Sequence, residues 1–230
     1  MHKIIIACDF PDQETLENFL LKLKTTEVTL KIGLELYYRE GNALISNLKD
    51  RGFAIFLDLK LHDIPNTVEK AMQNIAKLKV DMVNVHAAGG IDMMKRAKEG
   101  LNQYAPNTKL IAVTQLTSID QTILAEELGI HAPLEEIVSK YALNAKNAGL
   151  DGVVCSPLEA PIVHELCGED FLTVTPGIRL IEDSKDDQKR ITTPENAKEL
   201  KTDYIVVGRS ITKSSDPYKT YQVIKEMFYE

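Results

Sequence analysis

Apolar runs rich in β-branched residues recur eight times along the chain. They cover residues 4–9, 29–33, 54–60, 82–87, 109–116, 152–156, 173–178 and 204–211. Such runs predict buried β-strands, and most of them start 21 to 31 residues after the one before, which is the length of one strand with one helix. The long gap before residue 152 contains DQTILAEELGI, which predicts a small extra helix.

Helical patterns fill the gaps between these runs. Asp12 precedes QETLENFLLKL as a candidate N-cap, and Thr193 precedes the proline of PENAKEL. Asn66 and Glu69 have the spacing of a capping box. The unbroken series of strand-helix units predicts one domain over residues 1–230, with the α/β fold of a closed (β/α)8 TIM barrel. An open doubly wound sheet is the alternative, because it uses the same units.

The third run, FLDLKL, alternates leucines with charges. Leu57, Leu59 and Leu61 fall on one face of a strand, and Asp58 and Lys60 fall on the other. Helices cover the outer face of a barrel, so we expect the leucines to pack beneath them. The two charges then point toward the barrel axis, where an unpaired charge is costly.

The same alternation places other charges inside the predicted barrel. Lys31 lies between two apolar residues of the second run, and Asp9 shares the inward face of the first. With Asp58, Lys60 and Asp63 they are expected at the C-terminal mouth, where barrel enzymes keep their active sites. Opposite charges keep each other ionised there. The alternatives are a purely structural salt-bridge network and, for Asp63, a turn or capping role.

A second group of candidates follows the last two strands. Arg179 ends TPGIR, and Gly208 and Arg209 lie in VVGRS. Loops at this place often bind phosphate, since a glycine lets backbone N–H groups approach the anion and an arginine contacts it bidentately. Gln188 lies in the polar loop LIEDSKDDQKRITT, which is long enough for a lid. A simple bend, a surface arginine and a solvated loop are the alternatives.

Weaker candidates remain at other strand ends. Thr117 and Ser118 follow the fifth run and have hydroxyls for a polar ring edge, although such pairs are common in loops. His62 and His86 are more simply read as structural. No cluster of His, Cys and carboxylate residues has metal-ligand spacing in the sequence, so we expect no metal.

Composition narrows the classes of partner. The 230 residues carry a formal net charge of -7, which disfavours nucleic acid and anionic membranes. No apolar run approaches the roughly 20 residues of a membrane span, and MHKIIIACDF does not resemble a signal peptide. The three cysteines lack metal or CxxC spacing, which is typical of reduced, buried thiols. We therefore expect a cytoplasmic protein that binds a small molecule.

Several motifs together resemble one known family. The block Asp-x-Lys-x-x-Asp-Ile-Pro-Asn-Thr over residues 58–67 occurs with ACD, KIG, TPGIR and VVGRSI, each at its own strand. In this order, and over essentially the whole chain, they resemble the short, monofunctional bacterial orotidine 5'-phosphate decarboxylases. The resemblance implies conversion of orotidine 5'-phosphate to UMP in pyrimidine synthesis, without metal or organic cofactor.

The resemblance also implies a role for each motif residue. Lys60 would protonate C6 of the pyrimidine, Asp58 would lie against the leaving carboxylate, and Lys31 would hold Asp58 and contact the ribose. Asp63 and Thr67 would reach the neighbouring site of a homodimer. The remaining substrate contacts implied are Asp9 to the ribose, Thr117 to the pyrimidine edge, and Gln188, Gly208 and Arg209 to the phosphate, with Arg179 nearby.

Two other functions share parts of this pattern. Sister barrels that act on 3-keto-gulonate 6-phosphate or make hexulose phosphate have the same Asp-x-Lys-x-x-Asp block, but they use Mg²⁺ and an acidic residue near the position of Lys31. A lysine there disfavours a cation. A non-catalytic nucleotide-binding barrel would need the phosphate site but not the full set of charges.

Overall fold

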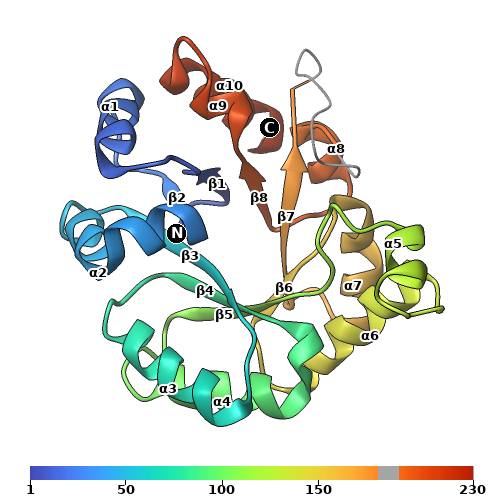
Figure 1. Ribbon diagram of the computed structural model, residues 1–230. Helices are drawn as coiled ribbons and strands as arrows, with labels where there is room; N and C mark the ends of the chain where they lie inside the picture. The colour runs from blue at the N-terminus through green and yellow to red at the C-terminus, as the bar shows by residue number, and fades with distance from the viewer. Residues whose placement is uncertain (181–191, 230) are drawn as a thin grey trace.

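The computed structural model describes residues 1–180 and 192–229 and shows parallel strands that close into a barrel in chain order, β1 to β8 (Figure 1). The strands are β1 (Ile4–Ala7), β2 (Thr29–Gly33), β3 (Ala54–Leu61), β4 (Met82–His86), β5 (Lys109–Val113), β6 (Gly152–Val154), β7 (Leu172–Ile178) and β8 (Tyr204–Val207). Because β1 pairs with β8, the sheet has no free edge and the open doubly wound alternative is excluded.

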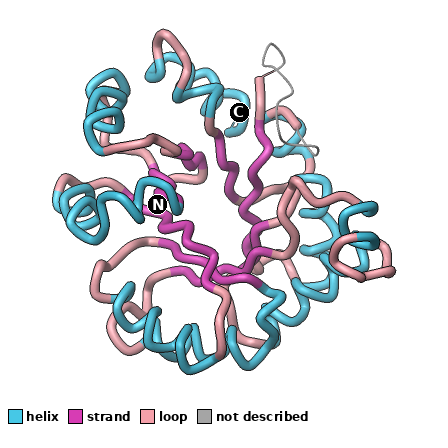
Figure 2. Tube along the Cα trace, in the orientation of Figure 1, coloured by secondary structure: helices cyan, strands magenta, loops and turns pink. Residues whose placement is uncertain are grey.

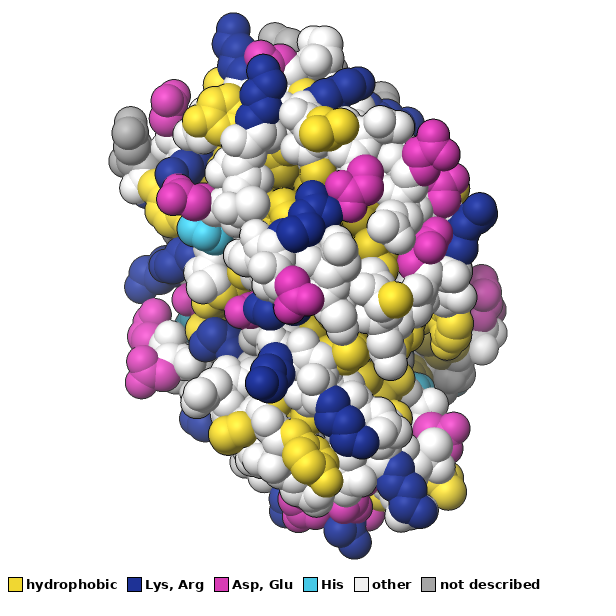
Figure 3. All heavy atoms as spheres, turned by 90° about the vertical axis from the view of Figure 1, so that its left-hand side faces the viewer, with side chains coloured by type: hydrophobic (Ala, Val, Ile, Leu, Met, Phe, Trp, Pro, Cys, Tyr) yellow, Lys and Arg dark blue, Asp and Glu magenta, His cyan; other side chains and the backbone are white. Residues whose placement is uncertain are grey.

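Helices surround the barrel on its outer side (Figure 2). They are α1 (Gln13–Leu23), α2 (Leu34–Asp50), α3 (Pro65–Ala76), α4 (Gly90–Asn102), α5 (Gln121–Glu126), α6 (Leu134–Asn147), α7 (Ala160–Cys167), α8 (Pro194–Glu199), α9 (Arg209–Thr212) and α10 (Pro217–Tyr229), with short 3-10 turns η1 (Ala87–Gly89) and η2 (Pro157–Glu159). In the described part of the chain, no helix combines the length and apolarity that crossing a membrane requires. Acidic and basic side chains are interspersed on the face that carries α1 and α2 (Figure 3).

Apolar residues form two separate cores. The larger core lies between the sheet and the helices and includes Leu57 and Leu59, with Leu61 packed against it. The smaller core fills the barrel interior and is built from Ile5, Ala7, Phe56, Met82, Ile111, Val174, Tyr204 and Val206. The predicted alternation along β3 is therefore confirmed: the leucines face the helices, and the charged positions share the inward face of Phe56.

Most predicted helix starts are confirmed, but one is wrong. Asp12 caps α1 by accepting a hydrogen bond from Thr15 N–H at 2.8 Å, and Thr193 caps α8. The proposed capping box at Asn66 does not form, because α3 already begins at Pro65 with Ile64 as its N-cap. The residue before a proline is pushed out of the helical region, and proline favours the first helical position.

Several strands end before the predicted residue, and the fifth and eighth strands differ most from the prediction. The eighth strand ends at Val207, because the N–H groups of Ile211 and Thr212 bond the carbonyl of Gly208 and close a helical turn. The fifth strand ends at Val113. Gly208 and Arg209 therefore lie just past the end of β8, where α9 begins.

Aspartates join neighbouring strands at the N-terminal end of the barrel, one just before each of β4, β6 and β8. Each accepts the backbone N–H of a residue in the preceding strand and lies against a basic or imidazole side chain from a helix. The sets are Asp81 with Ile55 and Lys49, Asp151 with Leu110 and Lys98, and Asp203 with Thr173 and His164. Each aspartate thus links one helix to two strands.

Candidate active site

A cavity of about 610 Å³ opens at the C-terminal mouth of the barrel. Its lining comprises Ala7, Asp9, Phe10, Lys31, Phe56, Asp58, Lys60, Val113, Gln115, Leu116, Thr117, Ser118, Val154, Cys155, Pro176, Gly177, Arg179, Val206, Gly208, Arg209, Thr212 and Lys213. Such a volume suits a small organic ligand. All eight strands aim toward this mouth, and residues of every strand except β4, or of the segments that follow those strands, line it.

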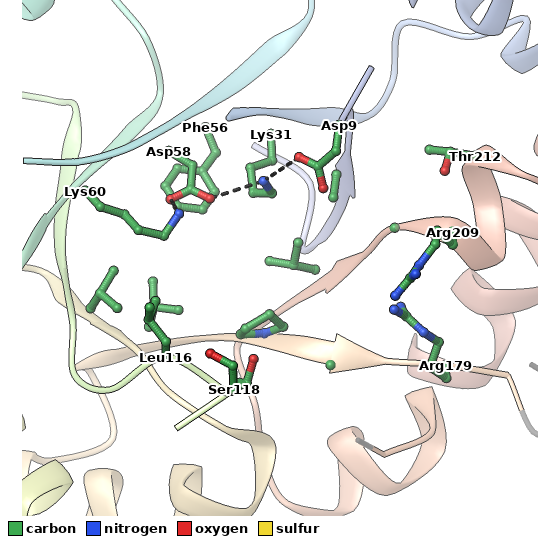
Figure 4. Close-up of a pocket in the computed structure, with 18 of the residues that line it drawn as sticks. Asp9, Lys31, Phe56, Asp58, Lys60, Leu116, Ser118, Arg179, Arg209 and Thr212 are labelled. Carbon is green, nitrogen blue, oxygen red and sulfur yellow. Dashed lines mark hydrogen bonds and ion pairs between the residues drawn. The ribbon is translucent and has the colours of Figure 1, made fainter. Parts of the chain in front are cut away.

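One row of alternating charges occupies a side of the cavity (Figure 4). The ammonium of Lys31 lies 3.1 Å from a carboxylate oxygen of Asp9 and 3.1 Å from one of Asp58. The other oxygen of Asp58 lies 2.7 Å from Lys60 Nζ. The side chain of Asp58 is 9% exposed, whereas that of Asp9 is 62% exposed. The buried carboxylate is therefore held between two ammonium groups, as the sequence predicted for these three side chains.

The charges within the row set each other's ionisation. Burial alone raises the pKa of Asp58, but Lys31, Lys60 and the hydrogen bonds from Lys60 and Asn84 outweigh it, so the pKa lies below its ordinary value. Burial alone lowers the pKa of Lys31, but Asp58 and then Asp9 reverse this, and the pKa lies above its ordinary value. Asp58 is thus an anion and Lys31 a cation at neutral pH.

Local sequence makes room for this row. An added Cβ at Gly33 would lie 3.3 Å from Asp9 Oδ1 and 3.4 Å from Lys31 Nζ, so the glycine of the KIG motif leaves space for the ion pair. In β3 the pairing with β4 is irregular between Leu57 and Leu61, and Lys60 has a φ of 51°. Such a bulge changes the direction of a side chain at a sheet rim.

Two arginines lie on another side of the cavity. Arg179 follows β7, Arg209 begins α9, and their guanidinium groups point toward each other (Figure 4). Gly208, Thr212 and Lys213 line the cavity beside them. The site therefore has a cationic region separate from the Asp58 row, and the apolar side chains of Phe56 and Val206 also line the cavity.

Thr117 and Ser118 both line the cavity, as does Gln115, in the loop after β5. They supply neutral donors and acceptors to the cavity wall. Cys155 also lines the cavity, and all three cysteines are buried thiols. Gln188 lies outside the described residues.

Asp63 and Thr67 are not brought into the cavity formed by the described part of their own chain. Asp63 accepts a hydrogen bond from the N–H of Ile64 at 2.7 Å, and Ile64 is 65% exposed beside it.

His62 and His86 lie against each other, with ring centroids 5.7 Å apart. Burial, followed by the charges of His62 and Lys60, lowers the pKa of His86. Residues 1–180 and 192–229 contain no group of three His, Cys, Asp or Glu residues that could hold a metal ion.

Comparison with known proteins shows to which family the chain belongs. A model of the orotidine 5'-phosphate decarboxylase / HUMPS family matches residues 2–224. The chain belongs to this family. Its resemblance to the orotidine 5'-phosphate decarboxylases, inferred from the sequence motifs, is confirmed by this match together with the relatives of that name described next.

Individual members of the orotidine 5'-phosphate decarboxylase family are similar over nearly their full length. The chain is 57% identical over 222 residues to orotidine 5'-phosphate decarboxylase of Staphylococcus saprophyticus, covering 96% of each, and 53% identical over 229 residues to that of Bacillus cytotoxicus, covering 98% of this chain and 96% of the other. A crystal structure of the enzyme from Lactobacillus acidophilus is 44% identical, with a TM-score of 0.90 and full coverage of both chains.

The sequence motifs did not identify every polar residue of the site. Thr212 and Lys213 were missed because the eighth strand was expected to continue to Ile211. Gln115 was missed because the fifth strand was expected to continue to Leu116, whereas it ends at Val113. Asn84, which bonds both Asp58 and Lys60, was also missed, although its inward position in β4 follows from the same alternation that identified Asp58.

Proposed function

We propose that this chain decarboxylates orotidine 5'-phosphate to UMP. The observation that carries the proposal is the buried Asp58 carboxylate held between Lys31 and Lys60, in one cavity with Arg179 and Arg209. This substrate has a carboxylate on its base and a phosphate at the other end. A site with two separate charged regions suits both ends, and family membership supports the same reaction.

In this proposal the cavity orients the substrate by its two ends. The phosphate binds at Arg209 and Gly208, with Arg179 nearby, because guanidinium groups form charge-assisted bonds to phosphate. The ribose hydroxyls contact Asp9 and Lys31. The pyrimidine then extends toward Lys60, and Thr117 and Ser118 lie along the wall where its polar edge would contact them.

Lys60 and Asp58 are the residues that act on the reacting groups of the substrate. The bond between C6 and the carboxylate carbon breaks, carbon dioxide leaves, and the electron pair remains at C6. An ammonium group fixed beside C6 stabilises this charge and then gives C6 its proton. The resulting lysine amine regains a proton from water. Asp58 stays ionised throughout, holds Lys60 in place, and repels the substrate carboxylate before it leaves.

We also propose that two chains form a homodimer with shared sites. Asp63 and Thr67 belong to the sequence block that contains Asp58 and Lys60, yet the described cavity of their own chain does not include them. They lie on the segment after β3, next to the exposed Ile64. An exposed apolar side chain beside a carboxylate that does not line its own chain's cavity fits a contact between subunits.

A direct assay tests the proposed reaction. Absorbance in the ultraviolet follows loss of orotidine 5'-phosphate by the purified protein, with EDTA present or absent. We expect equal turnover in both cases. Activity that disappears on chelation and returns with Mg²⁺ would favour the chemistry of the Mg²⁺-dependent sister barrels, and binding of UMP without turnover would favour a nucleotide-binding protein.

Subunit mixing tests the shared site. Homodimers of Lys60→Ala and of Asp63→Ala should both be strongly impaired. A hybrid dimer has one site with both residues intact and one site with neither. A statistical one-to-one mixture should therefore recover about one quarter of wild-type activity, since half the dimers are hybrids with one intact site each. Mixtures that stay inactive after proven subunit exchange would place Asp63 in its own chain's site.

A further inference from the structure

Asn84 occupies an unusual position beside the charge row. It lies in β4, is fully buried, and faces the barrel interior between Met82 and His86. Its Nδ2 donates to Asp58 Oδ1 at 2.7 Å, and its Oδ1 accepts from the backbone N–H of Lys60 at 2.7 Å. One carboxamide thus bonds two residues of the row at once.

The orientation of this carboxamide is fixed by its partners. A carboxylate only accepts hydrogen bonds, so it must face the NH₂ group of Asn84, and a backbone N–H only donates, so it must face the carbonyl oxygen. Reversing the amide would set two acceptors against each other and two donors against each other. The same side chain therefore recognises Asp58 as an anion and Lys60 by its backbone.

The backbone at Lys60 needs such support. Its φ of 51° lies in the left-handed region, which costs energy for a residue with a Cβ. The other described non-glycine residues with positive φ are Lys24, Lys79 and Lys201, and each lies within three residues after a helix. In the described chain, Lys60 is the one such residue inside a strand.

The irregular pairing of β3 with β4 explains why a side chain is used. Leu57 pairs with Val83 and Leu61 pairs with Val85, so three residues of β3 stand opposite Asn84 alone. The regular hydrogen bonding between the two strands therefore cannot satisfy the backbone N–H and C=O groups of all three residues. The carbonyl of the Asn84 side chain takes the place of a strand carbonyl for the Lys60 N–H.

We propose that Asn84 is a positioning residue for the decarboxylation, holding Lys60 in its left-handed conformation and Asp58 in its rotamer so that the ammonium is aimed at the reacting carbon. This inference rests on the proposed function. Asn84 itself does not line the cavity. It acts through Asp58 and Lys60, and its removal should impair the chemical step more than substrate capture.

Two substitutions separate positioning from stability. Asn84→Leu has a similar volume and loses both hydrogen bonds. We expect kcat to fall about 100-fold, the effect of misplacing a catalytic group by about 1 Å, with KM changed by less than about threefold. Asn84→Asp keeps the acceptor for Lys60 N–H but places a second carboxylate against Asp58. Its activity should depend on pH.

The direction of that dependence follows from the groups around position 84. The titratable and charged side chains nearby are Asp58 and Lys60 on β3, Lys31 on β2, Asp9 beyond β1, and His86 on β4 itself. Two adjacent carboxyls share a proton at low pH, and the protonated one donates to the other as the amide did. We expect Asn84→Asp to regain activity as the pH falls and to lose it as the pH rises, whereas Asn84→Leu stays low throughout.

Thr175→Val is the matched control. Thr175 is buried in β7, its hydroxyl donates to the carbonyl of Tyr204, and it does not line the cavity. It should lower Tm and leave kcat unchanged. If the Asn84 variants behave in the same way, or if neither variant folds, Asn84 is structural and the proposal is overturned. A wild-type chain without turnover would contradict the proposed function, whereas an active wild type with an equally active Asn84→Leu would contradict only this role.

Discussion

The two ends of the barrel both carry aspartate and lysine pairs, and the pairs are built differently. At the N-terminal end, Asp151 accepts the backbone N–H of Leu110 at 2.7 Å and Lys98 Nζ at 2.6 Å. At the C-terminal mouth, Asp58 is held by side chains, those of Lys31, Lys60 and Asn84. The first arrangement ties backbone segments together, and the second presents charge to a cavity.

This difference separates stability from chemistry within one fold. The aspartates at the N-terminal end recur before alternate strands, and their bonds join a helix to two strands at the end of the barrel opposite the cavity. The row at the mouth lies where barrel enzymes place their active sites, and it includes a lysine with a left-handed backbone. Burying charge in this way gains little stability, so a functional reason is expected.

The largest expected contrast is between two lysine substitutions. Lys60→Ala removes the proton donor and the fixed positive charge, so kcat should fall by at least about 10⁴-fold. In D₂O, wild-type UMP should carry deuterium at C6. Lys98→Ala removes one partner of Asp151, which still accepts the Leu110 N–H. It should cost about 1 kcal/mol of unfolding free energy and leave kcat unchanged.

Steady-state kinetics and chemical denaturation of the two lysine variants provide the check. Near wild-type turnover by Lys60→Ala would remove this lysine from the mechanism. A large loss of kcat in Lys98→Ala, with the protein folded, would contradict the separation between the two ends.

A smaller effect is expected at the arginine side of the cavity. Arg209→Ala should lower kcat/KM roughly 30- to 150-fold, because a charge-assisted bond to phosphate is lost. This loss corresponds to about 2 to 3 kcal/mol of transition-state stabilisation. Orotidine, which has no phosphate, should be turned over equally by the variant and the wild type. An equal loss with both substrates would make Arg209 structural.

Much of this architecture could be predicted from the sequence, because it follows from the alternation of apolar and charged side chains along the strands. The period of two in FLDLKL placed Asp58 and Lys60 inside the barrel and the leucines beneath the helices, and the repeated spacing of apolar runs predicted the strands. The same rule applied to MVNVH would have found Asn84, since Met82 and His86 share its face.

Other features depend on contacts that local sequence does not express. Lysine has no preference for positive φ, so the bend at Lys60 arises from the mismatch between β3 and β4 and could not be predicted from its neighbours. The capping box at Asn66 failed because Pro65 starts α3 one residue earlier. The convergence of Arg179 and Arg209 requires the barrel to bring the two strand ends together (Figure 4).

The smallest expected effect concerns the stability of the charge row itself, measured as the difference in unfolding free energy between wild type and Asp58→Asn from pH 2 to 11. The pKa of Asp58 is lowered in the folded state, so its contribution is present above the unfolded value of about 3.9 and is lost as the pH falls through the folded value. Each unit of lowering is worth about 1.4 kcal/mol. The pKa of Lys31 is raised, so its contribution is present below about 10.4 and is lost as the pH rises further.

The difference between the two proteins should therefore be flat between about pH 5 and 9 and should turn against wild type outside that range, because Asp58→Asn has no carboxylate to protonate and a Lys31 that has lost its main partner. The substitution removes a buried charge, so its absolute effect at neutral pH can have either sign, and the pH dependence is what reports the ion pairs. A difference that instead turns in favour of wild type as the pH falls through neutrality toward about 4 would mean that Asp58 has a raised pKa in the folded state. In that case the carboxyl would be protonated near neutrality, and it could neither hold Lys60 as an ion pair nor repel the substrate carboxylate.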